Sequence, residues 1–304
     1  MVEKITGIGA VVRDLEITMT RLWLFFGTGP WEVCENCGYR SATFQTKKIE
    51  FELIQPTRQD NIYASFLKNR GEGLCHIYIS FDSENTAEHY KKGLQDKGVH
   101  VVGDFAEVDS GRRICLNTWN ELGFGLELRT GKRSPGSLYN PKCTGSPNFP
   151  VRHYIRQMGI VVTDTEKTIR CYQRYLNLDG WKTVSFNNRN LEDFKINEKK
   201  YDGEFEFLCS VRWVGEVEFE LVEPLSGPLI YTDYLKYKGP GFHHIKSVMS
   251  DIEIRQLMGH LAQYEIHDIQ SGRLNDNHHF NLNTEPLVGF TLELGNGGKS
   301  IALS

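Results

Sequence analysis

The chain has 304 residues, of which 39% are hydrophobic and 24% charged, and its formal net charge is −4. This length suits about two domains, and the composition is ordinary for a globular protein. The negative charge argues against nucleic-acid binding. No apolar run reaches the roughly 20 residues of a membrane helix, and no secretory signal is recognisable. We therefore expect a cytoplasmic protein that binds neither nucleic acid nor membranes.

The first half predicts a strand–helix–strands order that occurs twice. A strand-like segment at 5–12 precedes a helix-like segment at 14–25, and strands then follow up to 54. A second strand at 74–81 precedes a helix at 83–98, and further strands end at 129. Alternation of polar and apolar residues, as in Ile49-Glu50-Phe51-Glu52-Leu53, supports the strands. The seven cysteines are scattered, and the Cys34/Cys37 pair has no second pair, so we expect free thiols.

The segment 131–151 is rich in Gly, Pro, Ser and Asn and lacks an apolar period, which predicts a linker. We expect an N-terminal domain at 1–130 and a C-terminal domain at 152–304. In the second half, 164–177 predicts the first helix with Asp164 as its N-cap, and a second helix starts near Asp251.

The two halves repeat one another. FELIQP (51–56) recurs as FELVEP (219–224), GEGLCHI (71–77) as GPGFHHI (239–245), and LGFGLEL (122–128) as VGFTLEL (288–294). Glu52 and Glu220 are 168 positions apart, as are His76 and His244, whereas Gly7 and its counterpart Gln157 are 150 apart. The C-terminal half therefore carries 18 extra residues, which we place within 186–206 as a longer loop or hairpin, either near the site or as a surface excursion.

Strand parity predicts which side chains of the second half face a cleft, because successive residues point to opposite sides. The apolar parity, with Met158, Ile160, Phe219 and Leu221 among its members, is assigned to the side covered by helices. The opposite parity places these residues in the cleft: Gln157, Glu218, Glu220, His244, Lys246, His279, Asn281, Asn283, Thr291 and Glu293.

Carboxylate, amide and imidazole groups on one concave face suit a divalent ion such as zinc, manganese, nickel, cobalt or iron(II). Clustered carboxylates without a cation would be costly in a cleft, and a metal removes that cost. The alternative is that each of these residues is an ordinary strand or core residue. The joint placement favours one metal site with Gln157, Glu220, His244 and Glu293 as ligands.

These motifs resemble the vicinal oxygen chelate (glyoxalase/bleomycin-resistance) superfamily, once per half, and look most like methylmalonyl-CoA epimerase-like proteins. The resemblance implies an α+β fold of two tandem domains, with four βαβββ modules forming curled mixed sheets and helices outside. It implies the same four ligands, whose first-half counterparts are Gly7, Glu52, His76 and Glu127. Since Gly7 cannot ligate, we expect an N-terminal site that is degenerate, or a weak one in which water completes the ligand set. A swapped site with ligands from both halves stays open, although we prefer a self-contained one.

The resemblance implies a metal-dependent isomerase or epimerase that moves a proton next to a carbonyl of a small molecule through a metal-stabilised enolate. Glu293 is then the candidate base, with Glu218 and His279 as alternatives. Lys246, Asn281 and Asn283 are candidate substrate-binding residues, although Lys246 could simply reach solvent. Other hypotheses are a glyoxalase-like lyase, a ring-cleaving dioxygenase and a non-catalytic binding protein. The substrate, the use of coenzyme A and homodimer formation are left open.

Overall fold

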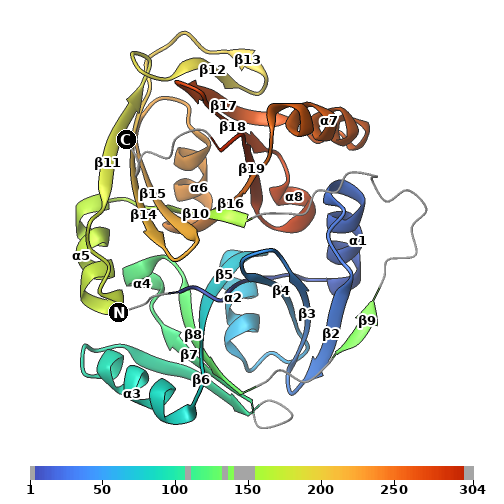
Figure 1. Ribbon diagram of the computed structural model, residues 1–304, viewed down its shortest axis with the longest axis vertical. Coiled ribbons are helices and arrows are strands. Elements are labelled where there is room, and N and C mark those ends of the chain that lie inside the picture. The colour runs from blue at the N-terminus through green and yellow to red at the C-terminus, as the bar shows by residue number, and fades with distance from the viewer. Residues whose placement is uncertain (1–3, 107–110, 132–135, 140–154, 298–304) are drawn as a thin grey trace.

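Two curled mixed sheets, each built from one half of the chain, form the structure (Figure 1). The computed structural model describes residues 4–106, 111–131, 136–139 and 155–297. The expected α+β fold of two tandem units with four βαβββ modules and helices outside is confirmed. No strand of one half joins the sheet of the other in the described ranges, so each cleft is lined by its own half.

The N-terminal sheet joins its two modules at the centre, where β1 runs parallel to β4 and antiparallel to β5. Its strands lie in the order β6 (His100–Ala106), β7 (Arg112–Asn117), β8 (Gly125–Thr130), β5 (Gly73–Phe81), β1 (Gly7–Val11), β4 (Glu50–Pro56), β3 (Tyr39–Gln45), β2 (Trp31–Asn36) and β9 (Ser137–Tyr139). Its helices are α1 (Leu15–Phe26), α2 (Ile62–Arg70), α3 (Glu84–Gln95) and the single turn α4 (Trp119–Leu122).

The C-terminal sheet repeats this plan, with β10 parallel to β15 and antiparallel to β16. Its strands lie in the order β11 (Lys182–Asn187), β14 (Glu206–Val214), β15 (Val217–Ser226), β10 (Ile155–Val161), β16 (Gly241–Val248), β19 (Thr291–Gly295), β18 (Asn277–Leu282), β17 (Asp268–Leu274), β12 (Glu192–Ile196) and β13 (Lys199–Lys200). Its helices are α5 (Thr165–Leu176), α6 (Ile230–Lys238), α7 (Asp251–Leu261), the 3₁₀ turn η2 (Ala262–Tyr264) and α8 (Glu285–Val288).

Helix starts follow the local sequence. Asp164 caps α5, because its Oδ1 accepts the Lys167 backbone N–H at 2.8 Å. Ser250 and Glu253 form a capping box at the start of α7. The apolar strand parity lies in the core as expected, since Met158, Ile160 and Phe219 are fully buried. The opposite parity is therefore free to line the concave side.

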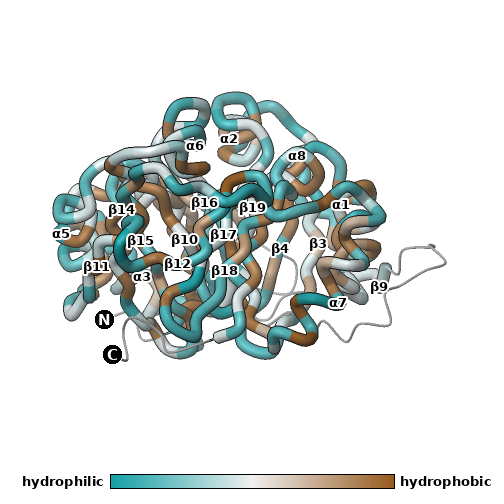
Figure 2. The backbone as a smooth tube through the Cα atoms, turned by 90° about the horizontal axis from the view of Figure 1, so that it is seen from above, coloured by the Kyte–Doolittle hydropathy of each residue, from teal (hydrophilic) through white to brown (hydrophobic). Residues whose placement is uncertain are grey.

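Helices α2 and α6 connect the two modules of each half and lie next to each other along one face of the molecule (Figure 2). Both reach the concave sides of the sheets. Tyr63 of α2 donates a hydrogen bond to Glu127 on β8, and Tyr231 of α6 lines the cavity that Glu293 also lines. The sequence motifs did not predict these two helices. Each of them supplies an aromatic side chain to the cleft of its own half.

Two segments without a repeat partner also have defined structure. Residues 137–139 of the predicted linker form β9, which pairs with β2, while 132–135 and 140–151 lie outside the described residues. The extra segment of the second half forms the β12–β13 hairpin, and β12 pairs with β17. This hairpin extends the C-terminal sheet at its far edge. In the described part of the chain, no helix is long and apolar enough to cross a membrane.

Candidate metal centre

Gly159 of β10 lies at the middle of the C-terminal site. In the register of the sheet it pairs with Glu220 of β15 on one side and His244 of β16 on the other. A Cβ atom at this glycine would lie 1.9 Å from Cε1 of His244. Only glycine therefore lets the imidazole lie across β10 and face Glu220.

Two carboxylates converge on one nitrogen of this imidazole. His244 Nε2 lies 3.0 Å from Glu220 Oε2 and 3.1 Å from Glu293 Oε2. His244 is fully buried and Glu293 nearly so. The ligand atoms of the three residues lie within 4.8 Å of one another, which is close enough to share one ion. The structure thus brings together three of the four residues predicted as ligands around one point.

Gln157 contributes a free oxygen to the same cleft. Its Nε2 donates to Glu218 Oε2 at 3.0 Å, which fixes the orientation of the amide. Its Oε1 is buried and has no hydrogen-bond partner among the residues that the structure describes. A buried acceptor without a partner costs free energy, and a cation would remove that cost. The fourth predicted ligand therefore offers an unsatisfied oxygen.

Lys246 does not extend into solvent. Its Nζ lies 2.8 Å from Glu293 Oε1, the oxygen that does not face His244. Burial raises the pKa of Glu293, but Lys246 and His244 outweigh burial and hold that pKa far below its usual range. Glu293 is therefore an ionised carboxylate with one oxygen held by the ammonium and the other directed at the imidazole.

The neighbouring His243 contacts the second ring nitrogen of His244. The two Nδ1 atoms lie 2.9 Å apart, so one of them must donate. Burial, together with the charge of His244, holds the pKa of His243 well below its usual value, so His243 is neutral. Donation from His244 Nδ1 to His243 leaves the Nε2 lone pair of a neutral His244 for a ligand. Without a metal, burial lowers the pKa of His244, but hydrogen bonds to Glu220 and Glu293 raise it to about 9.

The other predicted site residues divide into two groups. His279 lines the cavity together with Glu218 and Lys246, and burial lowers its pKa to about 4. Asn281 is buried beside Glu293 in the strand register, and its Nδ2 contacts the Gln270 carbonyl at 3.4 Å.

Asn283 does not belong to the site. Its Oδ1 accepts the His267 backbone N–H at 2.8 Å, and its Nδ2 donates to the Glu265 carbonyl at 3.1 Å. The expectation that Asn283 faces the cleft is corrected by these contacts. Strand β18 ends at Leu282, so the alternation of side chains does not continue to Asn283.

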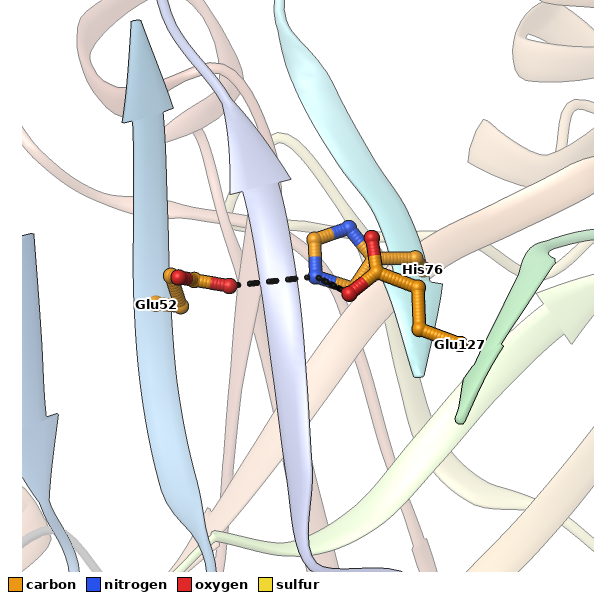
Figure 3. A group of neighbouring side chains, drawn as sticks. All are labelled: Glu52, His76 and Glu127. Atoms are coloured by element: carbon orange, nitrogen blue, oxygen red, sulfur yellow. Dashed lines mark hydrogen bonds and ion pairs between the residues drawn. The ribbon is translucent and has the colours of Figure 1, made fainter. Parts of the chain in front are cut away.

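The N-terminal half has the same triad, Glu52, His76 and Glu127 (Figure 3). His76 Nε2 lies 3.3 Å from Glu52 Oε2 and 3.6 Å from Glu127 Oε2. Gly7 stands where the other half has Gln157, and a Cβ there would lie 2.0 Å from the Tyr78 ring. By distance alone this triad also qualifies as a metal site.

Two buried arginines already occupy the carboxylates of this triad. Arg113 Nη2 donates to Glu52 Oε1 at 2.8 Å, and Arg129 Nη2 donates to Glu52 Oε2 and, at 2.8 Å, to Glu127 Oε2. The fourth oxygen, Glu127 Oε1, accepts from Tyr63 at 2.7 Å. Burial raises the pKa of Glu127, but His76 and both arginines lower it to about 2. Although the ligand atoms of this triad are close enough to share an ion, its carboxylates are already bound by arginines. We therefore interpret it as a counterpart of a metal site in which arginines take the place of the ion, and call it the arginine-filled triad.

The strand register explains why arginines bind the carboxylates of the N-terminal triad but not those of the C-terminal triad. Arg113 pairs with Arg129 in the N-terminal sheet, and the corresponding pair in the C-terminal sheet is His279 with Gly295. The sequence motifs predicted the shared acids and histidines but missed both arginines. The available signal was Arg129, two positions after Glu127 and therefore on the same face of β8.

The C-terminal donors fit a divalent ion. They comprise two carboxylate oxygens, one imidazole nitrogen and one amide oxygen without a partner among the described residues. Such a set suits metals that accept mixed oxygen and nitrogen ligands. The cavity lining carries three carboxylates, Glu218, Glu220 and Glu293, against two cationic side chains, Lys246 and Arg156, so a bound cation would offset the remaining negative charge.

Residues 156–264 match the model of the Glyoxalase/Bleomycin resistance protein/Dioxygenase superfamily. A mutant 4-hydroxymandelate synthase from Streptomyces coelicolor is similar in structure, with a TM-score of 0.66 and 12% identity, over 99% of this chain and 94% of that chain. The Mn(II)-bound glyoxalase from Novosphingobium aromaticivorans gives a TM-score of 0.53 and 14% identity, over 98% of this chain and 83% of that one. These likenesses show the fold.

A mutant methylmalonyl-CoA epimerase from Streptomyces coelicolor is 24% identical over 43% of this chain and 99% of that chain, with a TM-score of 0.37. A TM-score this low adds nothing to the structural argument. The search of curated proteins finds no match to this sequence.

Proposed function

Because the C-terminal half carries a domain of the vicinal oxygen chelate superfamily, we propose that the protein is a metal-dependent enzyme that moves a proton next to a carbonyl of a small molecule, as an isomerase or epimerase. The proposed metal ligands are Gln157, Glu220, His244 and Glu293. The proposed N-terminal domain at 1–130 holds the arginine-filled triad, and the proposed C-terminal domain at 152–304 holds the reaction site.

One observation carries this proposal. Glu220 Oε2 and Glu293 Oε2 lie 3.0 and 3.1 Å from His244 Nε2, and Gln157, which lines the same cavity, has a buried oxygen that lacks a partner among the described residues. Four strands, β10, β15, β16 and β19, and the glycine at 159 are needed to produce this arrangement. A buried amide oxygen without a partner, in a cavity that is also lined by carboxylates, favours a bound cation.

A bound divalent ion would supply stabilisation for negative charge that develops on the substrate oxygens. The protein's own residues would bind and move the proton. His279 is neutral near pH 7 and lines the cavity, so it can accept a proton there. Glu293 is a second candidate, although Lys246 holds one of its oxygens. Glu218 is a third, with one oxygen occupied by the Gln157 amide.

The cavity argues for a compact substrate. Its volume is about 60 Å³, and Phe186, Phe207 and Tyr231 form apolar walls around the polar floor. Lys246 could turn from Glu293 toward a carboxylate or phosphate on the substrate. Nothing in the cavity lining requires coenzyme A.

The donor set also separates the alternative reactions. Ring-cleaving enzymes with iron(II) commonly use two histidines and one carboxylate, whereas this site has one histidine, two carboxylates and an amide. This difference disfavours ring cleavage. A glyoxalase-like lyase uses the same proton chemistry and is the second candidate, and a non-catalytic binding protein is the third.

The first test measures metal per chain by elemental analysis, on protein purified without chelators and reloaded with manganese(II), zinc(II) or iron(II). We expect about one ion per chain in the wild type and its loss in His244→Ala, because this variant removes the nitrogen at the centre of the triad. The matched control, His76→Ala, removes the equivalent imidazole of the arginine-filled triad and should keep the ion. Wild-type protein that stays metal-free with every ion would overturn the metal site.

The second test measures exchange of substrate C–H hydrogen with solvent deuterium by NMR across a set of small carbonyl compounds. The proposed reaction predicts metal-dependent exchange that His279→Ala or Glu293→Gln reduces by about 10²–10⁴-fold. Metal binding without any exchange would refute the proton-transfer reaction and favour the binding-protein hypothesis.

A further inference from the structure

The concave side of the N-terminal sheet holds a large cavity. Its volume is about 800 Å³, within the range of ordinary small-molecule sites. Strands β5 to β8 and helices α2 and α4 line it, and the triad residues His76 and Glu127 lie in its lining. The cavity belongs to the half whose carboxylates are filled by arginines, so the proposed metal centre does not account for it.

Four aromatic side chains form its walls. Tyr63 and Phe66 come from α2, Phe105 from β6 and Trp119 from α4. Phe66 and Trp119 are tilted with ring centroids 5.1 Å apart, while Tyr63 and Phe105 are nearly parallel at 6.5 Å. Phe66, Phe105 and Trp119 are only half-buried, and Val102 beside them is 44% exposed. A cluster of incompletely buried aromatic and apolar side chains marks a site for a flat apolar ligand.

The carboxylates at the floor of this cavity already have cationic partners. Arg129 and Arg113 compensate the carboxylate at the floor, Glu127, together with Glu52 behind it. The Arg70 guanidinium lies 5.1 Å from the centre of the Trp119 ring and donates to the Pro240 carbonyl at 2.8 Å. Asp60 lies exposed at the mouth, where water screens it. A charged ligand would lose its hydration without gaining a free counter-charge at the floor.

We propose that the N-terminal cavity is a second binding site, independent of metal, for an uncharged aromatic compound. The arginine-filled triad closes its floor and replaces the ion of the C-terminal centre, so the ligand packs between aromatic side chains instead of chelating a metal. The inference does not depend on the reaction proposed for the C-terminal half.

The test titrates the full-length protein with N-phenyl-1-naphthylamine, an uncharged aromatic probe whose fluorescence rises in apolar surroundings, with and without EDTA. Val102→Trp should fill the cavity from its exposed wall and weaken binding about tenfold or more. The control, Leu225→Trp, makes the same change at a position of similar exposure, 49%, that lines neither cavity. Phe66→Ala, which removes one wall ring, provides a second variant and should weaken binding roughly two- to tenfold.

The expected result is one probe per chain, bound equally in EDTA, displaced by benzyl alcohol better than by benzoate, and weakened by both cavity variants but not by the control. Circular dichroism and thermal unfolding verify that each variant is folded. Loss of binding in EDTA, unchanged binding in both cavity variants, or displacement by benzoate equal to that by benzyl alcohol would overturn the proposal.

Discussion

His243 contacts the ring nitrogen of His244 that faces away from the two carboxylates. Its Nδ1 lies 2.9 Å from Nδ1 of His244, and its pKa is held low by burial. In the N-terminal half, Cys75 has the equivalent place, with its Sγ 2.8 Å from His76 Nδ1. In both halves a neighbouring side chain therefore contacts Nδ1 of the buried histidine. Only in the C-terminal half is this neighbour a neutral imidazole, whose Nδ1 can accept a hydrogen bond from His244.

Replacing His243 by leucine should weaken metal binding by about 10–100-fold, because His244 loses the acceptor that keeps its Nε2 lone pair directed at the carboxylates. The measurement is a competition titration with a fluorescent chelator, and His243→Gln, whose amide oxygen can accept, should recover part of the affinity. Cys75→Ala is the matched control and should leave the affinity unchanged. Equal affinities for wild type and His243→Leu would show that the tautomer is fixed by other contacts.

At the scale of the element, β7 carries two consecutive arginines with opposite surroundings. Arg112 pairs with Asp104 and Glu88 at 2.6 Å in a partly exposed position. Arg113 points to the concave side, is buried and donates to Glu52. The alternation of the strand places the two guanidinium groups on opposite faces of β7, one toward solvent and the other toward the concave side.

Arg113→Ala should lower the free energy of unfolding by roughly 3–5 kcal/mol, because it leaves the buried Glu52 with fewer compensating charges. Arg112→Ala breaks two pairs that solvent screens and should cost about 1 kcal/mol or less. Urea unfolding followed by circular dichroism compares the two neighbours directly. Similar losses in both variants would show that the buried arginine does not compensate the triad.

The same alternation explains what the sequence could and could not predict. It correctly paired Glu220 with the cleft and Phe219 with the core, because both lie inside a regular strand. It was wrong for Asn283, which follows the end of β18. It gave no sign that Arg113 and Arg129 meet over Glu52, since this depends on which residues of β7 and β8 lie opposite each other. Register between strands is set by long-range pairing, which repeats and periodicity do not contain.

At the scale of the whole molecule, the two halves share one hydrophobic core. Phe124 of the first half packs against three residues of the second, with ring centroids 5.9 Å from Phe219, 6.0 Å from Tyr172 and 6.3 Å from Phe242. Backbone contact continues this interface, because Phe242 N–H donates to the Gly123 carbonyl at 2.9 Å. Phe242 lies two positions before His244, so the packing of the first half supports the strand that carries the central ligand.

Phe124→Ala should therefore lower the free energy of unfolding by about 3–5 kcal/mol and weaken metal binding as well, although no atom of Phe124 belongs to the metal site. Tyr172→Phe is the matched control, because it keeps the ring and removes only the hydrogen bond from the Tyr172 hydroxyl to the Leu122 carbonyl, worth about 1 kcal/mol. Unfolding is followed by tryptophan fluorescence and far-ultraviolet circular dichroism, with and without metal. Two separate transitions in the wild type, only one of which shifts with metal, would mean that the halves unfold independently and that the shared core does not couple them.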